Sequence, residues 1–341
     1  MGDMLKLSAI VGLACIGAVA CAGANDTEAG EKDTDSLEAA AVADVLRDDV
    51  AANQEFRSPA SSDPMRQINL AAVTVTMAAG SARYITSNLR FGKATIHTLV
   101  DNDVTCRDSA GAVVQRFVHG ENIDIPGGAY DVAPITTRLL FTAPRAGTYT
   151  CTLSAWMRSL GAAGRVTVLS GFVEVVRSVS GGAQGETARQ TIAVQGTPAW
   201  TPVVPGTATL PDVAGKLWQA PAGTTRITAF GDIGLTSCRA DEGAPCPSSS
   251  TDTGSKARTQ LVVTQFKSDG SVCDTTVDSQ DTTIPKVQHH KVLYHHLPGV
   301  AVKTGDGCVP VFSIYVKTER LSGSPLYVHG PDESVAFVIP D

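Results

Sequence analysis

The sequence predicts an all-β protein built from two tandem antiparallel β-sandwiches, and three observations support this prediction. After residue 65, apolar and polar residues alternate in short runs, which is the period of a strand with one buried face. These runs recur at intervals of roughly ten residues, with Gly, Pro, Asp or Asn between them, as in sandwiches and barrels. Convincing helical periodicity is absent from this part of the sequence, and several of its features occur twice.

The expected strands are the runs with the clearest alternation. They are Ala72–Thr76, Ala94–Val100, Val166–Leu169, Phe172–Val176, Ile227–Phe230, Gln260–Thr264 and Val311–Val316. Their Val, Ile and Thr content suits a pleated, half-buried surface.

The second half of this region repeats features of the first half in the same order. The matching pairs are Asp101–Arg107 with Asp232–Arg239, Val113–Phe117 with Val262–Phe266, and Arg138–Pro144 with Lys291–Pro298. In each half a cysteine and then an apolar strand follow, Cys151 with Phe172–Val176 and Cys308 with Val335–Ile339. The shared order predicts two copies of one domain, residues 65–178 and 191–341, joined by a Gly-rich linker at 179–190.

The first 24 residues have the pattern of an export signal. Lys6 precedes the short apolar run Leu7–Ala20, and Ala22–Ala24 forms an A-x-A cleavage site before Asn25. Lipidation at Cys21 is the alternative, because Ala18–Cys21 resembles a bacterial lipobox. Both interpretations predict an exported protein, secreted or at the cell surface, and the second adds a lipid anchor as the sole link to a membrane.

Residues 25–64 are acidic and Ala-rich, with eleven acidic and three basic side chains. Such a segment buries little apolar surface, so we expect a mostly disordered spacer. One piece has a helical pattern of apolar residues, capped by Asp35 or Ser36 and formed by Leu37, Val42, Val45, Leu46 and Val50. It could serve as a docking helix or as part of the spacer. The whole chain carries a net charge of −7, so the region after residue 64 is close to neutral and nucleic-acid binding is not expected.

Six cysteines follow the leader: Cys106, Cys151, Cys238, Cys246, Cys273 and Cys308. An even number in an exported chain predicts disulfides rather than reduced thiols. The repeat predicts the pairs Cys106–Cys151 and Cys238–Cys308, which leaves Cys246–Cys273 for an insertion that the second copy alone contains. A local Cys238–Cys246 bond is an open alternative.

The stretch Ala146–Cys151 (AGTYTC) resembles the strand-F signature of immunoglobulin-like domains, with Tyr149 two residues before Cys151. The resemblance implies that Tyr149 is a corner tyrosine, that Cys106–Cys151 joins the two sheets, and that Phe117 replaces the core tryptophan. The second copy departs from the pattern, because Asp306 stands two residues before Cys308. The immunoglobulin topology and another β-sandwich therefore both remain open.

Histidines cluster in one short stretch, as His289, His290, His295 and His296, and His97, His119 and His329 complete the set. If this stretch is a strand, His289 and His295 share a face but lie ~20 Å apart, so one metal ion cannot bind both. We therefore expect partly exposed histidines at strand ends and no metal site.

Other candidate sites each have a structural alternative. Asp101 and Asp103 could bind calcium or stabilise a turn. Trp156, Trp200 and Trp218 could be ligand platforms or parts of the core. The sequence contains neither a G-x-S-x-G nor an H-E-x-x-H motif.

These observations predict an exported, non-catalytic binding or structural module without a cofactor, which meets a protein or glycan ligand at the cell surface. The Ser/Thr-rich loop Pro247–Lys256 is the expected variable binding loop. A carbohydrate-binding accessory protein is the alternative, and a metal-dependent secreted enzyme is the third interpretation.

Overall fold

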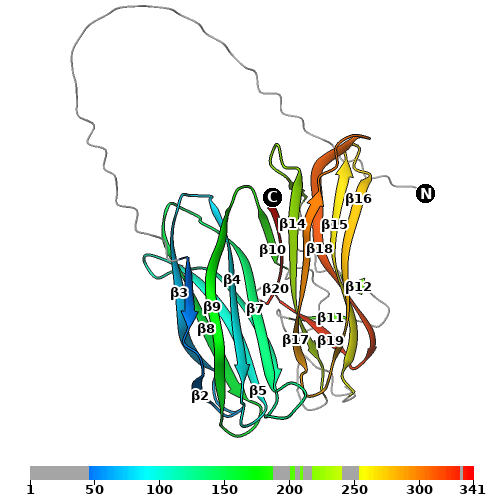
Figure 1. Cartoon of the computed structure of the whole chain (residues 1–341). Helices are drawn as coiled ribbons and strands as arrows, with labels where there is room; N and C mark the ends of the chain where they lie inside the picture. The colour runs from blue at the N-terminus through cyan, green and yellow to red at the C-terminus, as the bar shows by residue number, and fades with distance from the viewer. Residues whose placement is uncertain (1–45, 187–199, 204–207, 210–216, 240–252, 331–332) are drawn as a thin grey trace, which may run out of the picture. The chain divides into compact units, whose positions relative to one another are not determined.

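The computed structural model confirms the all-β prediction of two β-sandwiches, formed by four antiparallel sheets (Figure 1). It describes residues 46–186, 200–203, 208–209, 217–239, 253–330 and 333–341. The predicted export signal and Cys21 lie outside these residues. Within them, no helix has the length and apolarity that crossing a membrane requires.

The first sandwich consists of sheets A and B. Sheet A has the order β3 (Arg66–Met77), β8 (Gly147–Ser159), β5 (Thr98–Asp108) and β6 (Val113–Ile123). In sheet B, β1 (Arg47–Val50) and β2 (Gln54–Ser58) both pair with β9 (Gly164–Val179), and β4 (Ala82–Gly92) and β7 (Val132–Thr142) follow. Alternate residues point into the space between the sheets, where Leu89, Phe117 and Leu153 are fully buried.

The structure corrects the predicted spacer where it is described, from residue 46 onward, whereas most of the predicted helix, residues 35–45, lies outside the described residues. Residues 47–50 and 54–58 are strands at the edge of sheet B, and Val50 is buried in the core of the first sandwich. Pairing of Arg47–Val50 with Glu174–Gly171 supplies the backbone hydrogen bonds that a helix would have supplied. At Arg47–Val50, tertiary pairing therefore replaces the end of the expected helix.

The second sandwich consists of sheets C and D. In sheet C, β14 (Arg226–Ser237) pairs on one side with β17 (His290–Ala301) and on the other with β20 (Ser334–Pro340) and β19 (Leu326–His329). Outside these lie β10 (Ala183–Glu186) and β11 (Trp200–Val203). Because β10 belongs to this sheet, part of the predicted linker 179–190 is a strand.

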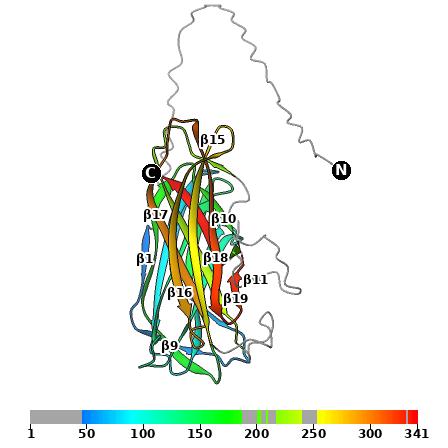
Figure 2. The ribbon, with the colours of Figure 1, turned by 90° about the vertical axis from the view of Figure 1, so that its right-hand side faces the viewer.

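Sheet D completes the second sandwich. Its order is β18 (Cys308–Gly323), β15 (Ser255–Lys267) and β16 (Val272–Ile284), and the short strands β12 (Ala208–Thr209) and β13 (Trp218–Gln219) pair with β18. Figure 2 shows β15, β16 and β18 running alongside one another.

The two sandwiches have the same strand order, as expected of tandem copies. Sheets A and D correspond, as do sheets B and C, so that β4, β5, β7 and β8 match β14, β15, β17 and β18. The repeat predicted from the sequence matches Asp101–Arg107, in β5, with Asp232–Arg239, which begins in β14. Because β5 corresponds to β15 and not to β14, this match is displaced by one strand. The later matches, of Arg138–Pro144 and Cys151 onward, join corresponding strands.

Sheet C is covered on both of its faces. From one face of β14 and β20, Phe230, Val335, Phe337 and Ile339 join the apolar core of the first sandwich. The opposite faces of the same strands pack into the core of the second sandwich. Accordingly, β14 is buried at every position after Arg226. The two sandwiches therefore share a continuous apolar contact.

The strand order of the first sandwich differs from that of an immunoglobulin domain, although some strand pairs are shared. The pairs β4–β7 and β5–β8 correspond to the central pairs of that fold. The first and last strands have exchanged sheets, since β3 pairs with β8 and β9 pairs with β4. The corner tyrosine is present, because the Tyr149 hydroxyl donates a hydrogen bond of 2.6 Å to the carbonyl oxygen of Arg145.

The Cys106–Cys151 disulfide forms as predicted, but it does not join the two sheets. Cys106 and Cys151 are direct cross-strand partners in β5 and β8 of sheet A. The prediction that Cys106–Cys151 joins the two sheets is therefore wrong, because β5 and β8 belong to the same sheet.

The second predicted pair is also wrong, since Cys308 is bonded to Cys273 and not to Cys238. The Cys238 amide donates to Pro325 beyond the far end of β18, whereas Cys308 begins that strand. Sixteen extended residues span roughly 50 Å, so Cys238 cannot reach Cys308. Cys273–Cys308 also excludes Cys246–Cys273. Cys238 is disulfide-bonded, and its partner, like Cys246, lies outside the described residues.

Candidate functional site

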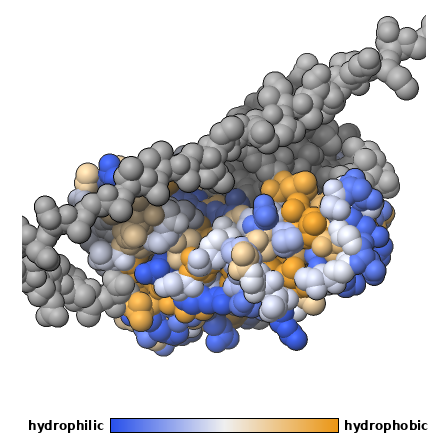
Figure 3. All heavy atoms as spheres, turned by 90° about the horizontal axis from the view of Figure 1, so that it is seen from above, coloured by the Kyte–Doolittle hydropathy of each residue, from blue (hydrophilic) through white to orange (hydrophobic). Residues whose placement is uncertain are grey.

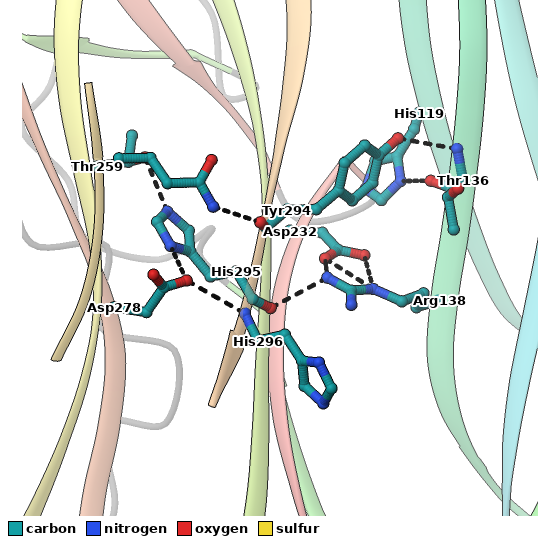
Figure 4. A network of polar contacts seen from close by, with 10 residues as sticks. His119, Thr136, Arg138, Asp232, Thr259, Asp278, Tyr294, His295 and His296 are labelled. Atoms are coloured by element: carbon teal, nitrogen blue, oxygen red, sulfur yellow. Dashed lines mark hydrogen bonds and ion pairs between the residues drawn. The ribbon is translucent and has the colours of Figure 1, made fainter. Parts of the chain in front are cut away.

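A buried ion pair joins the two sandwiches (Figure 4). The Arg138 guanidinium on β7 donates to both carboxylate oxygens of Asp232 on β14, with Nε 3.1 Å from each of them. A second nitrogen of Arg138 donates to Asp232 and to the carbonyl oxygen of His295. The Arg138 side chain is 11% exposed and that of Asp232 is fully buried. This bidentate pair fixes the position of β14 and β17 against sheet B.

Tyr294 of β17 extends the same junction. Its hydroxyl accepts a 2.9 Å hydrogen bond from the backbone N–H of Thr136, at the edge of sheet B. The Thr136 carbonyl accepts a 2.8 Å bond from Nδ1 of His119, whose ring meets Tyr294 edge-on. Burial lowers the pKa of His119 and raises that of Tyr294 well above its usual value. Both side chains are therefore neutral at neutral pH.

Next to the ion pair, a carboxylate, an imidazole and a hydroxyl form a chain of hydrogen bonds (Figure 4). Asp278 lies 2.9 Å from Nδ1 of His295, and Nε2 of His295 lies 2.8 Å from the Thr259 hydroxyl. Because the carboxylate accepts from Nδ1–H, Nε2 accepts from the hydroxyl. Burial lowers the pKa of His295, although Asp278 opposes this shift.

A second chain of this kind lies at the end of β14. Glu333 bonds to Nδ1 of His329, whose Nε2 lies 2.6 Å from the Thr236 hydroxyl. Nδ1 of His290 lies 2.8 Å from the same hydroxyl. Since the one hydroxyl proton points to His329, His290 donates to Thr236.

In each chain a carboxylate contacts an imidazole and the imidazole contacts a hydroxyl, which is the arrangement that activates a hydroxyl nucleophile in some enzymes. Thr259 is fully buried, however, and Thr236 is 2% exposed, so neither hydroxyl faces solvent in this structure. The arrangement supports packing of strands rather than reaction with a substrate.

The expectation of partly exposed histidines is wrong for four of the seven histidines. His119, His289, His295 and His329 are buried, because the junction and the end of sheet C cover them. His296, on the opposite face of β17 from His295, is exposed and stacks on Phe230 at 4.7 Å. Among the described residues, no group of three or more His, Cys, Asp or Glu side chains could hold a metal ion.

Asp101 and Asp103 lie in the middle of β5 and not in a turn, which corrects the predicted turn. Asp103 is fully buried and accepts hydrogen bonds from Arg116 (2.6 Å), Trp156 (3.0 Å) and Thr105 (2.7 Å). Its oxygens are therefore engaged within sheet A and not arranged around an ion.

The outer face of sheet A presents a different kind of site, which we call the Trp156 face. It consists of Trp156 and Arg158 on β8, Asp101 and Asp103 on β5, and Arg116 on β6. Trp156 and Asp101 are cross-strand neighbours, and the Arg116 guanidinium lies 5.5 Å from the Trp156 ring. Paired threonine hydroxyls, Thr74–Thr150 and Thr76–Thr148, continue this face along β3 and β8.

Two groups on the Trp156 face have donor or acceptor atoms that are not used in hydrogen bonds within the described residues. Nε of Arg158 is buried and has no hydrogen-bond partner among the described residues. Burial and the neighbouring Asp103 raise the pKa of Asp101 to about 7. The Asp101 carboxyl lies over Gly120, where a Cβ atom would come within 2.3 Å of its Oδ1. Near neutral pH this carboxyl can therefore donate or accept.

The other predicted sites are placed less favourably for binding. Trp218 packs on Phe312 in the second sandwich and donates to the carbonyl of Gly181, while Trp200 is the first residue of β11. Most of the loop Pro247–Lys256 lies outside the described residues, and Ser255 and Lys256 begin β15.

Exposed large apolar side chains lie on several different elements. Figure 3 shows hydrophobic and hydrophilic residues intermixed over the visible part of one end of the molecule. The exposed residues are Leu46, Val113, Ile125, Val176, Leu217, Val272, Val277, Val287 and Leu321. Single exposed apolar residues of this kind are ordinary at protein surfaces.

No protein-family model and no curated protein matches this chain. One solved structure that aligns with it is the CBM22-1–CBM22-2 tandem domain of Paenibacillus barcinonensis Xyn10C, at 12% identity over 86% of this chain and 98% of that one, with a TM-score of 0.23. Another is the infectious bursal disease virus VP2 subviral particle, at 10% identity over 86% and 76%, with a TM-score of 0.24. Such scores carry no argument about this chain. Its own geometry defines a disulfide-containing tandem β-sandwich protein.

Proposed function

We propose that this chain is an exported, non-catalytic binding module that meets its ligand with the Trp156 face. The observation that supports this most is the position of Trp156 on an outer sheet face, beside a carboxyl and a guanidinium with unused hydrogen-bonding capacity. Aromatic rings among a few polar groups are common in binding surfaces. The disulfides Cys106–Cys151 and Cys273–Cys308 agree with an oxidising compartment and therefore with export.

A carbohydrate ligand is the second candidate, and the chemistry of the same face favours it. A tryptophan ring can pack against a sugar ring, and Asp101 and Arg158 can bond to hydroxyl groups. A protein ligand would use the same aromatic and arginine side chains. The two ligand classes therefore need a direct comparison.

The test is to apply the full chain to a glycan array and to a panel of extracellular proteins, with Trp156→Ala and Arg158→Gln as variants. Tyr315→Ala changes an aromatic residue of β18, in the corresponding sheet of the second sandwich, and serves as the control. We expect binding to fall at least tenfold in both variants and to persist in the control. Binding to glycans alone would establish the second candidate. Equal binding by folded Trp156→Ala would remove this face from the function.

A further inference from the structure

Glu121 occupies an unusual position where β6 of the first sandwich meets β17 of the second. Both are edge strands, and they contact each other through side chains instead of a backbone ladder. Asn122 accepts a 3.1 Å hydrogen bond from the backbone N–H of His290, and Glu121 accepts a 3.3 Å bond from that of Val292. These two side chains therefore satisfy donors on the open edge of β17.

The carboxyl of Glu121 has few compensating contacts for a charge. The residue is 7% exposed, and its hydrogen-bond partners among the described residues are an amide side chain and a backbone N–H, not a cation. Its remaining contact is a 3.3 Å hydrogen bond from the amide of Gln288, which is also buried. Two long hydrogen bonds compensate poorly for the loss of hydration of a carboxylate.

The surrounding groups do not supply the missing charge. On β17, Lys291 favours the ionised form only through its more distant charge, and the hydroxyl of Tyr294 is neutral. On β6, His119 is buried and its pKa is lowered, so it is neutral as well. His289 precedes β17, and His290 is the first residue of that strand. Burial raises the pKa of Glu121 to about 7, and the bond from Val292 and the charge of Lys291 oppose this shift.

The Gln288 amide fits a neutral acid in either of its two orientations. With Nε2 toward Glu121, as placed here, the acid accepts a hydrogen bond, and Oε1 of Gln288 is buried without a partner. With the amide turned over, Oε1 faces Glu121, and only a protonated carboxyl can donate to it. A carboxylate is compatible with the first orientation alone.

We propose that Glu121 is held as an uncharged acid in the junction between the two sandwiches, and that its ionisation loosens the contact between β6 and β17. The junction is then a pH-sensitive device that is closed in mildly acidic surroundings. The hydrogen bond from Val292 favours the ionised form, but the burial of the charge outweighs it. The contact between β6 and β17 therefore opens to admit water, and this opening exposes the Val292 amide.

The direction of the pH effect on stability follows from a comparison of the proton affinity of Glu121 in the folded and the unfolded chain. The folded chain holds the Glu121 proton more tightly than the unfolded chain, whose ordinary pKa is 4.5. This contribution to stability therefore falls as pH rises from about 4.5 to about 7, and is constant above. The change in the unfolding equilibrium constant reaches a few hundredfold at most.

The experiment compares the full-length protein with Glu121→Gln, a neutral side chain of the same shape, in denaturant unfolding between about pH 5 and about pH 8. We expect Glu121→Gln to unfold less readily than the natural chain near pH 8, with the difference shrinking by at least tenfold toward pH 5. Glu55→Gln changes an exposed carboxylate paired with Arg165 and is the matched control. A Glu121→Gln variant that is equally weakened at every pH would overturn the proposal.

Hydrogen exchange of the natural protein provides an independent measurement. After correction for intrinsic rates, the Val292 amide should lose at least tenfold protection between about pH 5 and about pH 8, while amides in the centre of sheet A do not. Should Glu121→Gln fail to fold, carboxyl NMR of the natural protein decides. A set of glutamates that all titrate below about pH 5 would contradict the proposal.

Discussion

Arg138 of β7 and Asp232 of β14 bring a bidentate ion pair into the junction between the two sandwiches. Arg138 also lies over the rings of Phe230 and Tyr294, at 5.0 and 5.5 Å. The pair is therefore largely buried and lies beside two aromatic rings. In such surroundings each charge depends on the other, because neither has water to replace its partner.

Breaking this pair should destabilise the protein strongly. Asp232→Asn leaves the Arg138 charge buried, and we expect a loss of about 3–5 kcal/mol in the free energy of unfolding. The double variant Arg138→Met/Asp232→Leu removes both charges and should lose much less. Denaturant unfolding measures both changes. Arg258→Gln, in the exposed pair with Asp281, is the control and should have a clearly smaller effect. A double variant as unstable as Asp232→Asn would contradict this interpretation.

The corner tyrosine makes a smaller and more local contribution. Tyr149→Phe keeps the buried ring against Phe141 and removes only the bond to the Arg145 carbonyl. We expect the free energy of unfolding to fall by about 1 kcal/mol, with no change in fold. Tyr315→Phe serves as the control in the same unfolding experiment. If Tyr149→Phe is as stable as the natural protein, the hydrogen bond does not stabilise the corner.

Local patterns in the sequence predict most of the strands, although only Thr98–Val100 of the expected strand Ala94–Val100 lies in one, β5. The alternation in Ala72–Thr76, Gln260–Thr264 and Val311–Val316 lies within β3, β15 and β18. The final strand also has a recognisable pattern. Val335–Ile339 is apolar without alternation, which is typical of a strand covered on both faces, and in β20 these residues join two cores.

The sequence does not reveal which residues that are far apart in the chain contact each other in the fold. Arg138 and Asp232, or Glu121 and Val292, are far apart in the chain, and no local pattern marks them as neighbours. The same holds for Cys273 and Cys308, which meet because β16 and β18 flank β15. The repeat predicts the wrong cysteine pair, because it matches Cys238, directly after β14, with Cys106 of β5.

The disulfide assignment can be tested chemically. Peptide mapping without reduction should recover the bonds Cys106–Cys151 and Cys273–Cys308. Replacing Cys106 and Cys151 together by Ser should lower the free energy of unfolding by about 4 kcal/mol, because the bond closes a segment with a sequence separation of 45. Recovery of a Cys238–Cys308 peptide would contradict the structure.

The chain Thr259–His295–Asp278 gives a pH dependence opposite to that of Glu121. Burial lowers the pKa of His295, so the folded state binds its proton less tightly than the unfolded state. The stability that depends on neutral His295 is present above the unfolded pKa of 6.5 and is lost as pH falls through that value toward the lower folded pKa. His295→Gln should weaken the protein near pH 8 and reduce its further loss of stability toward pH 5. His97→Gln, with a side chain that is 42% exposed, is the control in the same unfolding series. A His295→Gln protein that loses stability in acid as steeply as the natural chain would show that His295 is not the group responsible.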